Sequence, residues 1–262
     1  MSPARLIAVL ATALALVSGL GYVASQTFLS SSVEVAAGRP YVEAPAPSPQ
    51  QQGQAGDASA GKGGKKASRS QPRTGRVQVD PQWVQATAQK AGIPAPAVRA
   101  YANAQLAAPA GCDIGWTTLA GIGWVESQHG TLDGRTLGED GYSSTRIIGP
   151  ALDGDGFAAI PATPASSQWH GDPQWDHAVG PMQFIPSSWE RWAADGDGDG
   201  VEDPNDIDDA AMAAVGYLCA DGHDLTTGAG WADAVFSYNH AQEYIDAVHA
   251  AASSYAARTS PS

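Results

Sequence analysis

Glu126 is the acidic residue of this chain whose surroundings best suit acid catalysis. It follows Leu119 and Ile122 at helical spacing, which places the three side chains on one face of a helix. A carboxyl group on an apolar face loses hydration, and the loss raises its pKa, so that it can keep a proton near neutral pH. The spacing alone also fits a glutamate that faces solvent or pairs with Arg146 or Arg191.

Two polar clusters could close a cleft around Glu126. The first is Gly-Pro-Met-Gln-Phe, from Gly180 to Phe184, and the second is Tyr238-Asn239. An acid between two such clusters suggests acid catalysis on a sugar polymer.

The segment from Asp195 to Val201 has the pattern of a calcium loop. Asp195, Asp197 and Asp199 alternate with glycine, Gly200 permits a sharp bend, and Val201 would offer its carbonyl, as in the first seven positions of an EF-hand loop. The expected twelfth position is Asp206 and not glutamate, so the standard loop length is in doubt. The alternative is a solvated acidic turn, although clustered carboxylates repel one another without a cation.

Zinc is a weaker possibility than calcium. The six histidines show no zinc-type spacing, and His170 with His177 is the pair that could act as ligands.

Helical periodicity and capping residues predict a mainly α fold. Asp80 and Pro81 begin the first predicted helix, Asp113 is the expected cap of the Glu126 helix, and Ser187 with Glu190 forms a possible capping box. The predicted helices are Asp80 to Ala91, Pro96 to Leu106, the segment from Asp113 through Glu126, Trp189 to Ala194, the segment from Asp206 through Leu218, Trp231 to Asn239, and Ala241 to Ala257.

Residues 130–179 are rich in Gly, Pro, Asp and Ser and show no sustained alternation. We expect a long, mostly irregular excursion with a short hairpin, which folds over the domain and lines a groove. Its expected apolar anchors are Ile147, Ile148, Phe157, Trp169 and Trp175.

The N-terminal part of the chain predicts export. Residues 1–30 carry Arg5, an apolar run and small residues, as in a cleaved signal peptide, and an uncleaved anchor is the alternative. Residues 31–79 are poor in large apolar side chains and basic towards their end, which predicts a disordered linker that could contact an anionic envelope. Residues 80–262 form the predicted folded domain.

Charge separates the linker from the domain. Residues 1–79 hold eight Lys/Arg and three Asp/Glu, whereas residues 80–262 hold six and twenty-four. So acidic a domain lacks the basic face that nucleic-acid binding requires. The two cysteines, Cys112 and Cys219, can form one disulfide in an exported protein, and two buried thiols are the alternative.

Five short motifs in order resemble the lytic murein transglycosylases. They are Glu-Ser-x-x-Gly from Glu126, the Gly180 to Phe184 cluster, the acidic loop, Tyr-Leu-Cys from Tyr217, and Tyr-Asn-His from Tyr238. The likeness covers about residues 110–250 and is closest to the B-type branch in its secreted, actinobacterial form. It implies a lysozyme-like transglycosylase domain with a long irregular insertion and an EF-hand-like calcium loop.

The resemblance also implies residue roles. Glu126 would protonate the glycosidic oxygen between N-acetylmuramic acid and N-acetylglucosamine, then act as base on the 6-hydroxyl and leave a 1,6-anhydro end. Supporting or substrate-binding roles would fall to Ser127, Gly180, Met182, Gln183, Phe184, Tyr238 and Asn239. In the B-type branch the loop is longer, and its last ligand corresponds to Asp209, with Asp206 as the alternative. Calcium would be structural and remote from Glu126.

Two other functions stay open at this point. A hydrolytic muramidase would need a second carboxylate across the bond, and an acidic chain offers several. A calcium-stabilised wall-binding module would leave Glu126 inert. We expect a monomer that acts on peptidoglycan strands outside the cytoplasm.

Overall fold

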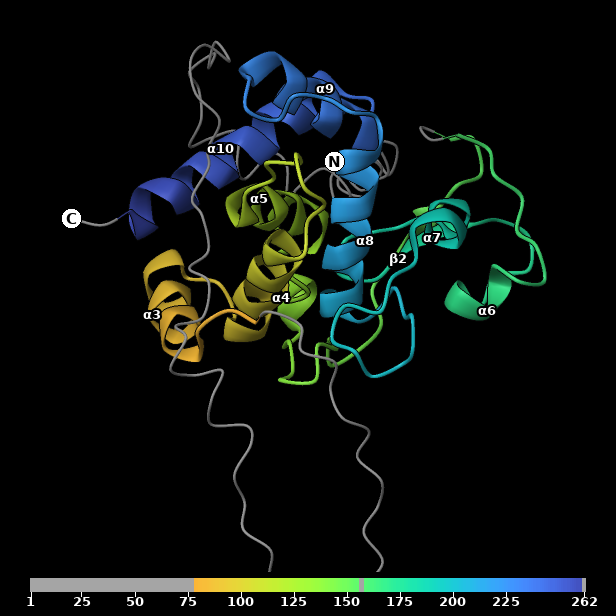
Figure 1. Ribbon diagram of the computed structural model, residues 1–262. Coiled ribbons are helices and arrows are strands. Elements are labelled where there is room, and N and C mark those ends of the chain that lie inside the picture. Colours follow the sequence, from red (N-terminus) through yellow and green to blue (C-terminus); the bar gives the residue numbers. More distant parts are fainter. Residues whose placement is uncertain (1–77, 156–157, 261–262) are drawn as a thin grey trace, which may run out of the picture.

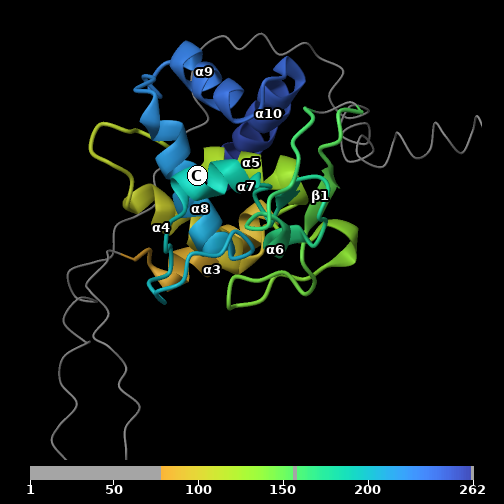
Figure 2. The ribbon, with the colours of Figure 1, turned by 90° about the vertical axis from the view of Figure 1, so that its right-hand side faces the viewer.

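The helix that carries Glu126, α5 (Trp116–Ser127), lies in the middle of the folded part of the chain, between α4 and α10 (Figures 1 and 2). Its residues from Trp116 to Gly123 are all buried. A helix that is apolar on every side belongs in a core. The predicted apolar face is therefore only one part of the buried surface of α5.

The computed structural model describes residues 78–155 and 158–260. The other helices are α3 (Pro81–Ala91), α4 (Ala95–Leu106), α6 (Ser167–His170), α7 (Pro186–Trp192), α8 (Ile207–Ala220), α9 (Gly228–Tyr238) and α10 (Gln242–Thr259), with a 3-10 turn at Leu132–Gly134. Strands β1 (Ile148–Ala151) and β2 (His177–Val179) form one small sheet. The mainly α fold class is confirmed. The expected signal segment and nearly all of the linker lie outside the described residues.

None of the helices in residues 78–155 and 158–260 is long and apolar enough to span a membrane.

The predicted cap of α3 is present, and Asp206 provides a cap for α8. The Asp80 carboxylate accepts hydrogen bonds from the backbone N–H groups of Gln82 and Trp83 at the start of α3. The Asp206 carboxylate accepts one from Asp208 N–H at the start of α8. Both side chains satisfy N–H groups that have no partner within their helix.

Two other caps differ from the prediction. α5 begins at Trp116, three residues after Asp113. The side-chain oxygen of Gln105, from α4, accepts a hydrogen bond of 2.8 Å from the Trp116 N–H, so a residue from another helix caps α5. α7 begins at Pro186 with Ile185 as its cap residue, so Ser187 lies inside the helix. Proline lacks an N–H and has a helical φ, and it therefore starts the helix earlier than the capping box implied.

α5 and α10 pack closely together in the core at Gly121. A Cβ atom placed on Gly121 would lie 2.7 Å from the Val248 carbonyl oxygen. Glycine inside a helix costs about 1 kcal/mol relative to alanine, so its presence here has a packing reason. Gly121 allows the two backbones to come together.

The segment between α5 and α7 is mostly irregular and ends in the small sheet. β1 and β2 pair antiparallel, with Ile148 opposite Val179 and Ala151 opposite His177. The expected hairpin is thus a sheet whose strands are joined by a long connection, residues 152–176. Figure 1 shows α6 and its loops at the side of the molecule remote from α3.

The expected anchors of this segment differ in their burial. Ile147 is buried, and Trp169 is partly buried against the core. Trp175 is partly exposed. Ile148 was wrongly expected as an anchor, because it lies on the outward face of β1 and is 42% exposed. Phe157 lies outside the described residues.

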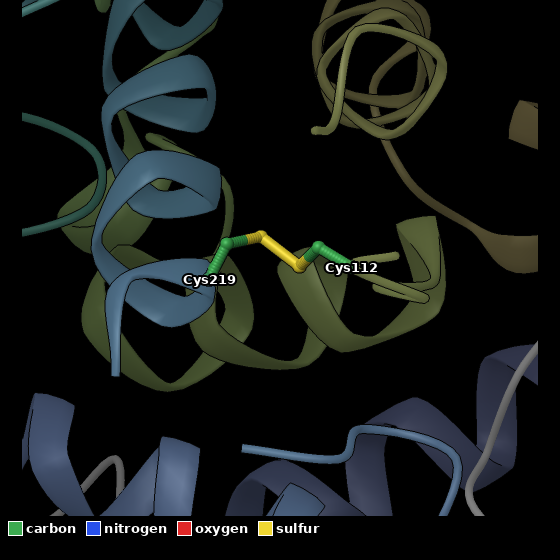
Figure 3. Close-up of a disulfide and its surroundings, with 2 residues drawn as sticks. All are labelled: Cys112 and Cys219. Carbon is green, nitrogen blue, oxygen red and sulfur yellow. A yellow bond between two sulfur atoms is a disulfide. The ribbon is translucent and has the colours of Figure 1, made fainter. Parts of the chain in front are cut away.

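The disulfide joins Cys112, in the loop before α5, to Cys219 in the last turn of α8 (Figure 3). The two Cα atoms lie 5.7 Å apart, and the residues are separated by 107 positions. The structure therefore favours the disulfide over two free thiols. The bond links the loop before α5 covalently to α8, in the second half of the domain.

Candidate active site

Glu126 occupies the last turn of α5, where its carboxyl group meets the first turn of α10. The hydroxyl of Tyr244 donates a hydrogen bond of 2.6 Å to Glu126 Oε1. Burial raises the pKa of Glu126 to about 7, and the hydrogen bond from Tyr244 lowers it in part. The residue is still partly exposed. A partly accessible carboxyl group with this pKa can give up a proton and take one back near neutral pH.

Tyr244 is a member of the site that the sequence did not reveal. It precedes Ile245 and Val248 on the buried face of α10 and has the spacing of an ordinary core residue. No sequence signal separates it from its apolar neighbours. Only the approach of α10 to α5 directs its hydroxyl towards Glu126.

Tyr238 lies beside Tyr244 but does not hydrogen-bond to Glu126. The two rings are nearly parallel, with centroids 6.5 Å apart. The Tyr238 hydroxyl donates to the Met182 carbonyl oxygen at 2.9 Å. Burial, with the charge of Glu126 next in size, raises the pKa of both phenols. Both therefore remain hydrogen-bond donors beside the acid, and Tyr238 uses its hydroxyl to hold the 180–183 turn.

The 180–183 turn is a tight loop between Val179 and Phe184. These two residues exchange backbone hydrogen bonds of 2.9 and 3.1 Å. Gly180 has φ +77°, and a Cβ atom there would lie 1.8 Å from the Pro204 carbonyl oxygen. Glycine is thus required both for the backbone conformation and for the contact. The turn rests directly on the segment that leads into α8.

Gln183 adopts a left-handed backbone conformation, with φ +51°. Its Nε2 donates to the Gly180 carbonyl oxygen at 2.9 Å, which closes the turn. Met182 and Phe184 are buried in the core. Their side chains anchor the turn in the core. Among residues 180–184, Gln183 is the one that is partly exposed.

Ser127 connects α5 to the same turn. Its hydroxyl donates to the Pro181 carbonyl oxygen at 2.6 Å and accepts the Gly130 N–H at 2.8 Å. The side chain is buried. Ser127 therefore fixes the end of α5 against the 180–183 turn and does not face a ligand directly.

Asn239 follows Tyr238 at the end of α9 and is exposed. Its backbone N–H donates to the Val235 carbonyl oxygen. Its side-chain amide makes no hydrogen bond within residues 78–155 and 158–260. The amide therefore has unused hydrogen-bonding capacity among these residues.

The acidic loop brings three carboxylates together. Oxygen atoms of Asp195, Asp197 and Asp209 lie within 4.8 Å of one another. Asp209 is buried in the first turn of α8 and accepts hydrogen bonds from the N–H groups of Gly196 and Asp203. Burial raises the pKa of Asp209 to about 6. Three hard oxygen donors in so small a space fit a divalent cation such as calcium.

Two other predicted calcium ligands, Asp199 and Asp206, lie outside the three-carboxylate group. Asp199 accepts the Val201 N–H and is not part of the three-carboxylate group. Asp206 caps α8 and is also outside that group. Of the two proposed final ligands, Asp209 is thus the one placed beside Asp195 and Asp197.

His170 and His177 lie together, but they do not complete a metal site in the described residues. Their ring centroids are 4.9 Å apart. His170 Nε2 lies 3.2 Å from Asp176, and His177 Nε2 lies 3.2 Å from Asp172. Each ring is thus engaged with its own carboxylate, and among the described residues the two rings do not share a group of three possible metal ligands.

Comparison with known proteins gives one family and two solved structures. Residues 166–247 match the model of the transglycosylase SLT domain family. The Escherichia coli lytic transglycosylase Slt35 in complex with bulgecin A is 17% identical, with 70% of this chain and 76% of that chain covered and a TM-score of 0.42. The same enzyme in complex with calcium is 17% identical, with 70% and 77% covered and a TM-score of 0.43. No curated protein matches the chain significantly.

The family match covers only one side of the site. It contains the 180–183 turn, the acidic loop, Tyr238 and Tyr244, whereas Glu126 and Ser127 precede it. The two parts meet at the hydrogen bond between Tyr244 and Glu126.

Proposed function

We propose that this protein is a peptidoglycan lytic transglycosylase. It would cleave the β-1,4 bond between N-acetylmuramic acid and N-acetylglucosamine and leave a 1,6-anhydro end. The observation that carries the proposal is the 2.6 Å hydrogen bond from Tyr244 to Glu126. Tyr244 belongs to the segment that matches the transglycosylase family, and burial raises the pKa of Glu126 to about 7. The family match supports a glycan-cleaving enzyme, and Glu126 would supply the acid.

In the proposed reaction Glu126 acts twice. Its carboxyl proton passes to the glycosidic oxygen as the bond from that oxygen to the muramic acid C1 breaks. The carboxylate then takes the proton of the C6 hydroxyl, whose oxygen bonds to C1. The proton on Glu126 is thereby restored, and no water is consumed. Tyr244 stabilises the carboxylate between the two steps, because a hydrogen bond to the charged form favours it.

The other side chains of the site would bind or support the substrate. Asn239 has a free, exposed amide, which we propose bonds to an acetamido group of the glycan. Gln183 would present its amide from the 180–183 turn. Ser127 and Tyr238 would hold that turn against α5 through the carbonyl oxygens of Pro181 and Met182.

The anhydro product is favoured over hydrolysis by the surroundings of Glu126. A hydrolase needs a second carboxylate across the bond. Several acids follow Glu126 in the irregular segment, and five of them have partners elsewhere: Asp133 with Arg135, Glu139 with Arg99, Asp140 with Tyr142 N–H, Asp172 with His177, and Asp176 with Ser166 and His170. The groups that shift the pKa of Glu126 include no carboxylate.

We propose that calcium binds Asp195, Asp197 and Asp209, with Asp199 and the Val201 carbonyl completing the set as in an EF-hand loop. The ion would neutralise the clustered carboxylates. The loop leads into Pro204, which supports Gly180, so an ordered loop would stiffen the 180–183 turn.

The proposed place of action is the cell wall, outside the cytoplasm, with glycan strands as partner. The predicted signal segment and basic linker agree with this location.

Mass spectrometry of the muropeptides that the full chain releases from purified peptidoglycan tests the proposal, with Glu126→Gln as control. We expect anhydro-muramyl ends from the wild type alone. Reducing ends, heavier by one water, would replace the proposal with a muramidase. Release by neither protein would favour a wall-binding module.

A further inference from the structure

His129, three residues after Glu126, is a buried histidine with two tyrosine partners. His129 Nδ1 lies 3.1 Å from the Tyr101 hydroxyl, and His129 Nε2 lies 2.9 Å from the Tyr255 hydroxyl. His129 is only 2% exposed and has φ +61°. A left-handed conformation is uncommon for a residue other than glycine, and such strain persists only where the surroundings hold it.

The three side chains form an uncharged network. Burial lowers the pKa of His129 to about 3, so its ring is neutral near pH 7. A neutral imidazole donates from one nitrogen and accepts at the other, and each tyrosine hydroxyl can take either role. Both ring nitrogens are therefore satisfied, and His129 links α4, which carries Tyr101, to α10, which carries Tyr255.

Gly123 of α5 makes room for the network. A Cβ atom on Gly123 would lie 2.0 Å from the Tyr101 hydroxyl oxygen, so glycine is needed for the tyrosine to reach His129. The His129 N–H donates to the Gly123 carbonyl oxygen, which ends the helix. The end of α5 and the position of the His129 ring are thus fixed together, three residues after Glu126.

Three contacts join α10 to α5 and to the residue pair that follows it. The two backbones meet at Gly121 and Val248. Tyr244, four residues before Val248, binds Glu126. Tyr255, seven residues after Val248, binds His129. The Tyr244 and Tyr255 hydrogen bonds lie on opposite sides of Val248, the point where α10 crosses α5. The Tyr255 bond to His129 therefore limits rotation of α10 about this point. By limiting the rotation, it also keeps Tyr244 within reach of Glu126.

We propose that His129 is a positioning residue for Glu126, which acts by holding Tyr255 and so fixes the arrangement of α5 and α10 in which Tyr244 reaches the Glu126 carboxyl group. The part of this inference that concerns turnover rests on the proposed function. The part that concerns the Glu126 carboxyl group does not.

The consequence for Glu126 has a definite sign. The Tyr244 hydrogen bond lowers the pKa of Glu126 against the effect of burial. Loosening that bond therefore raises the pKa. It also removes support from the carboxylate that forms after proton transfer, so kcat falls and KM changes little.

Tyr255→Phe tests the inference by removing one hydroxyl. The Arg258 guanidinium lies 5.1 Å from the Tyr255 ring centroid, a contact that phenylalanine keeps. The measurement is an NMR titration of the ¹³C-labelled Glu126 carboxyl group in the full chain, assigned by its absence in Glu126→Gln. Tyr142→Phe, which removes a hydroxyl that donates to Asp203 and not to a residue of α5 or α10, is the control.

We expect Tyr255→Phe to raise the pKa of Glu126 by about half a unit or more, a size that such titrations resolve. Tyr244→Phe should raise it further, and the double variant should match Tyr244→Phe, because both changes act through one bond. An unchanged Glu126 pKa in folded Tyr255→Phe, or additive shifts in the double variant, would overturn the inference.

Variants at position 129 keep the inference testable if Tyr255→Phe folds poorly. His129→Gln can still donate and accept and should retain the wild-type pKa of Glu126 more closely than His129→Leu. Equal shifts in these two variants would contradict the positioning role. The titration needs no turnover, so a protein that forms no anhydro product would refute the proposed function and leave this inference intact.

Discussion

Tyr244 and Glu126 are 118 positions apart in the chain, yet a hydrogen bond of 2.6 Å joins them. The bond connects the segment that matches the transglycosylase family to the helix that precedes it. It also opposes the effect of burial on the Glu126 carboxyl group. The chemistry proposed for Glu126 thus depends on the contact between α5 and α10.

Glu126→Gln should abolish nearly all turnover while the protein stays folded. The amide oxygen of glutamine can still accept the Tyr244 hydrogen bond, but the amide cannot supply a proton. Turnover on purified peptidoglycan and the melting temperature are the two measurements. Glu243→Gln, the same change at an exposed position beside Tyr244, is the matched control and should keep its activity. An active Glu126→Gln protein would remove Glu126 from the mechanism.

The stability that Glu126 contributes should decrease as pH rises. The folded protein holds the Glu126 proton up to about pH 7, whereas an unperturbed glutamate loses it near 4.5. The folded state therefore binds more protons between these values, and the free energy of unfolding falls as pH rises through them. Urea unfolding at several pH values should show Glu126→Gln gaining stability relative to the wild type from pH 4.5 to 7. A difference independent of pH would show that the pKa is not raised.

Calcium should stabilise the protein through Asp209. A ligand at 100 times its dissociation constant adds about 2.7 kcal/mol to the free energy of unfolding. We expect calcium to raise the melting temperature of the wild type and to have little effect on Asp209→Asn.

Asp206→Asn distinguishes the two candidate ligands. Asp206 caps α8, but asparagine is itself a good cap, so the substitution should cost less than about 1 kcal/mol of folding free energy. The calcium response should nevertheless remain. A response lost in Asp206→Asn and kept in Asp209→Asn would reverse the assignment.

Gly180→Ala should destabilise the fold by more than the backbone conformation alone explains. A non-glycine residue at positive φ costs about 1–2 kcal/mol. Gly171 has φ +85° with no atom within 4 Å of an added Cβ, so Gly171→Ala measures this cost by itself. Gly180→Ala adds a collision with the Pro204 carbonyl oxygen and should lose at least twice as much on urea unfolding. Equal losses would mean that Pro204 moves aside freely.

Reduction of the disulfide should destabilise the domain substantially. The bond between Cys112 and Cys219 closes a loop of 107 residues, for which the loss of chain entropy predicts about 4–5 kcal/mol. Urea unfolding of the Cys112→Ser/Cys219→Ser double variant, compared with the oxidised wild type, measures the effect. A loss below about 1 kcal/mol would contradict the entropic account.

Local rules predicted the features that depend on neighbours in the chain. Asp80 caps α3 because its side chain reaches the N–H groups two and three residues ahead. The Asp113 cap failed because Gln105, from another helix, accepts the Trp116 N–H. No local rule contains that contact.

The candidate site was predictable only in part, for the same reason. Glu126 has a helical apolar pattern, and Gly180 has a turn pattern, so both could be found in the sequence. Tyr244 looks like a core residue, and His129 has no pattern, because their roles arise where α10 crosses α5. The bond of Tyr238 to the Met182 carbonyl oxygen likewise depends on two segments that are remote in the sequence.

The most direct test of the account is digestion of peptidoglycan by the full chain in ¹⁸O-labelled water, with product masses recorded at early times. We expect the muramyl ends released by the wild type to carry no ¹⁸O, because the C6 hydroxyl and not water attacks C1. One ¹⁸O atom in each new end would show that water is the nucleophile, and the single-glutamate, anhydro-forming mechanism would be wrong.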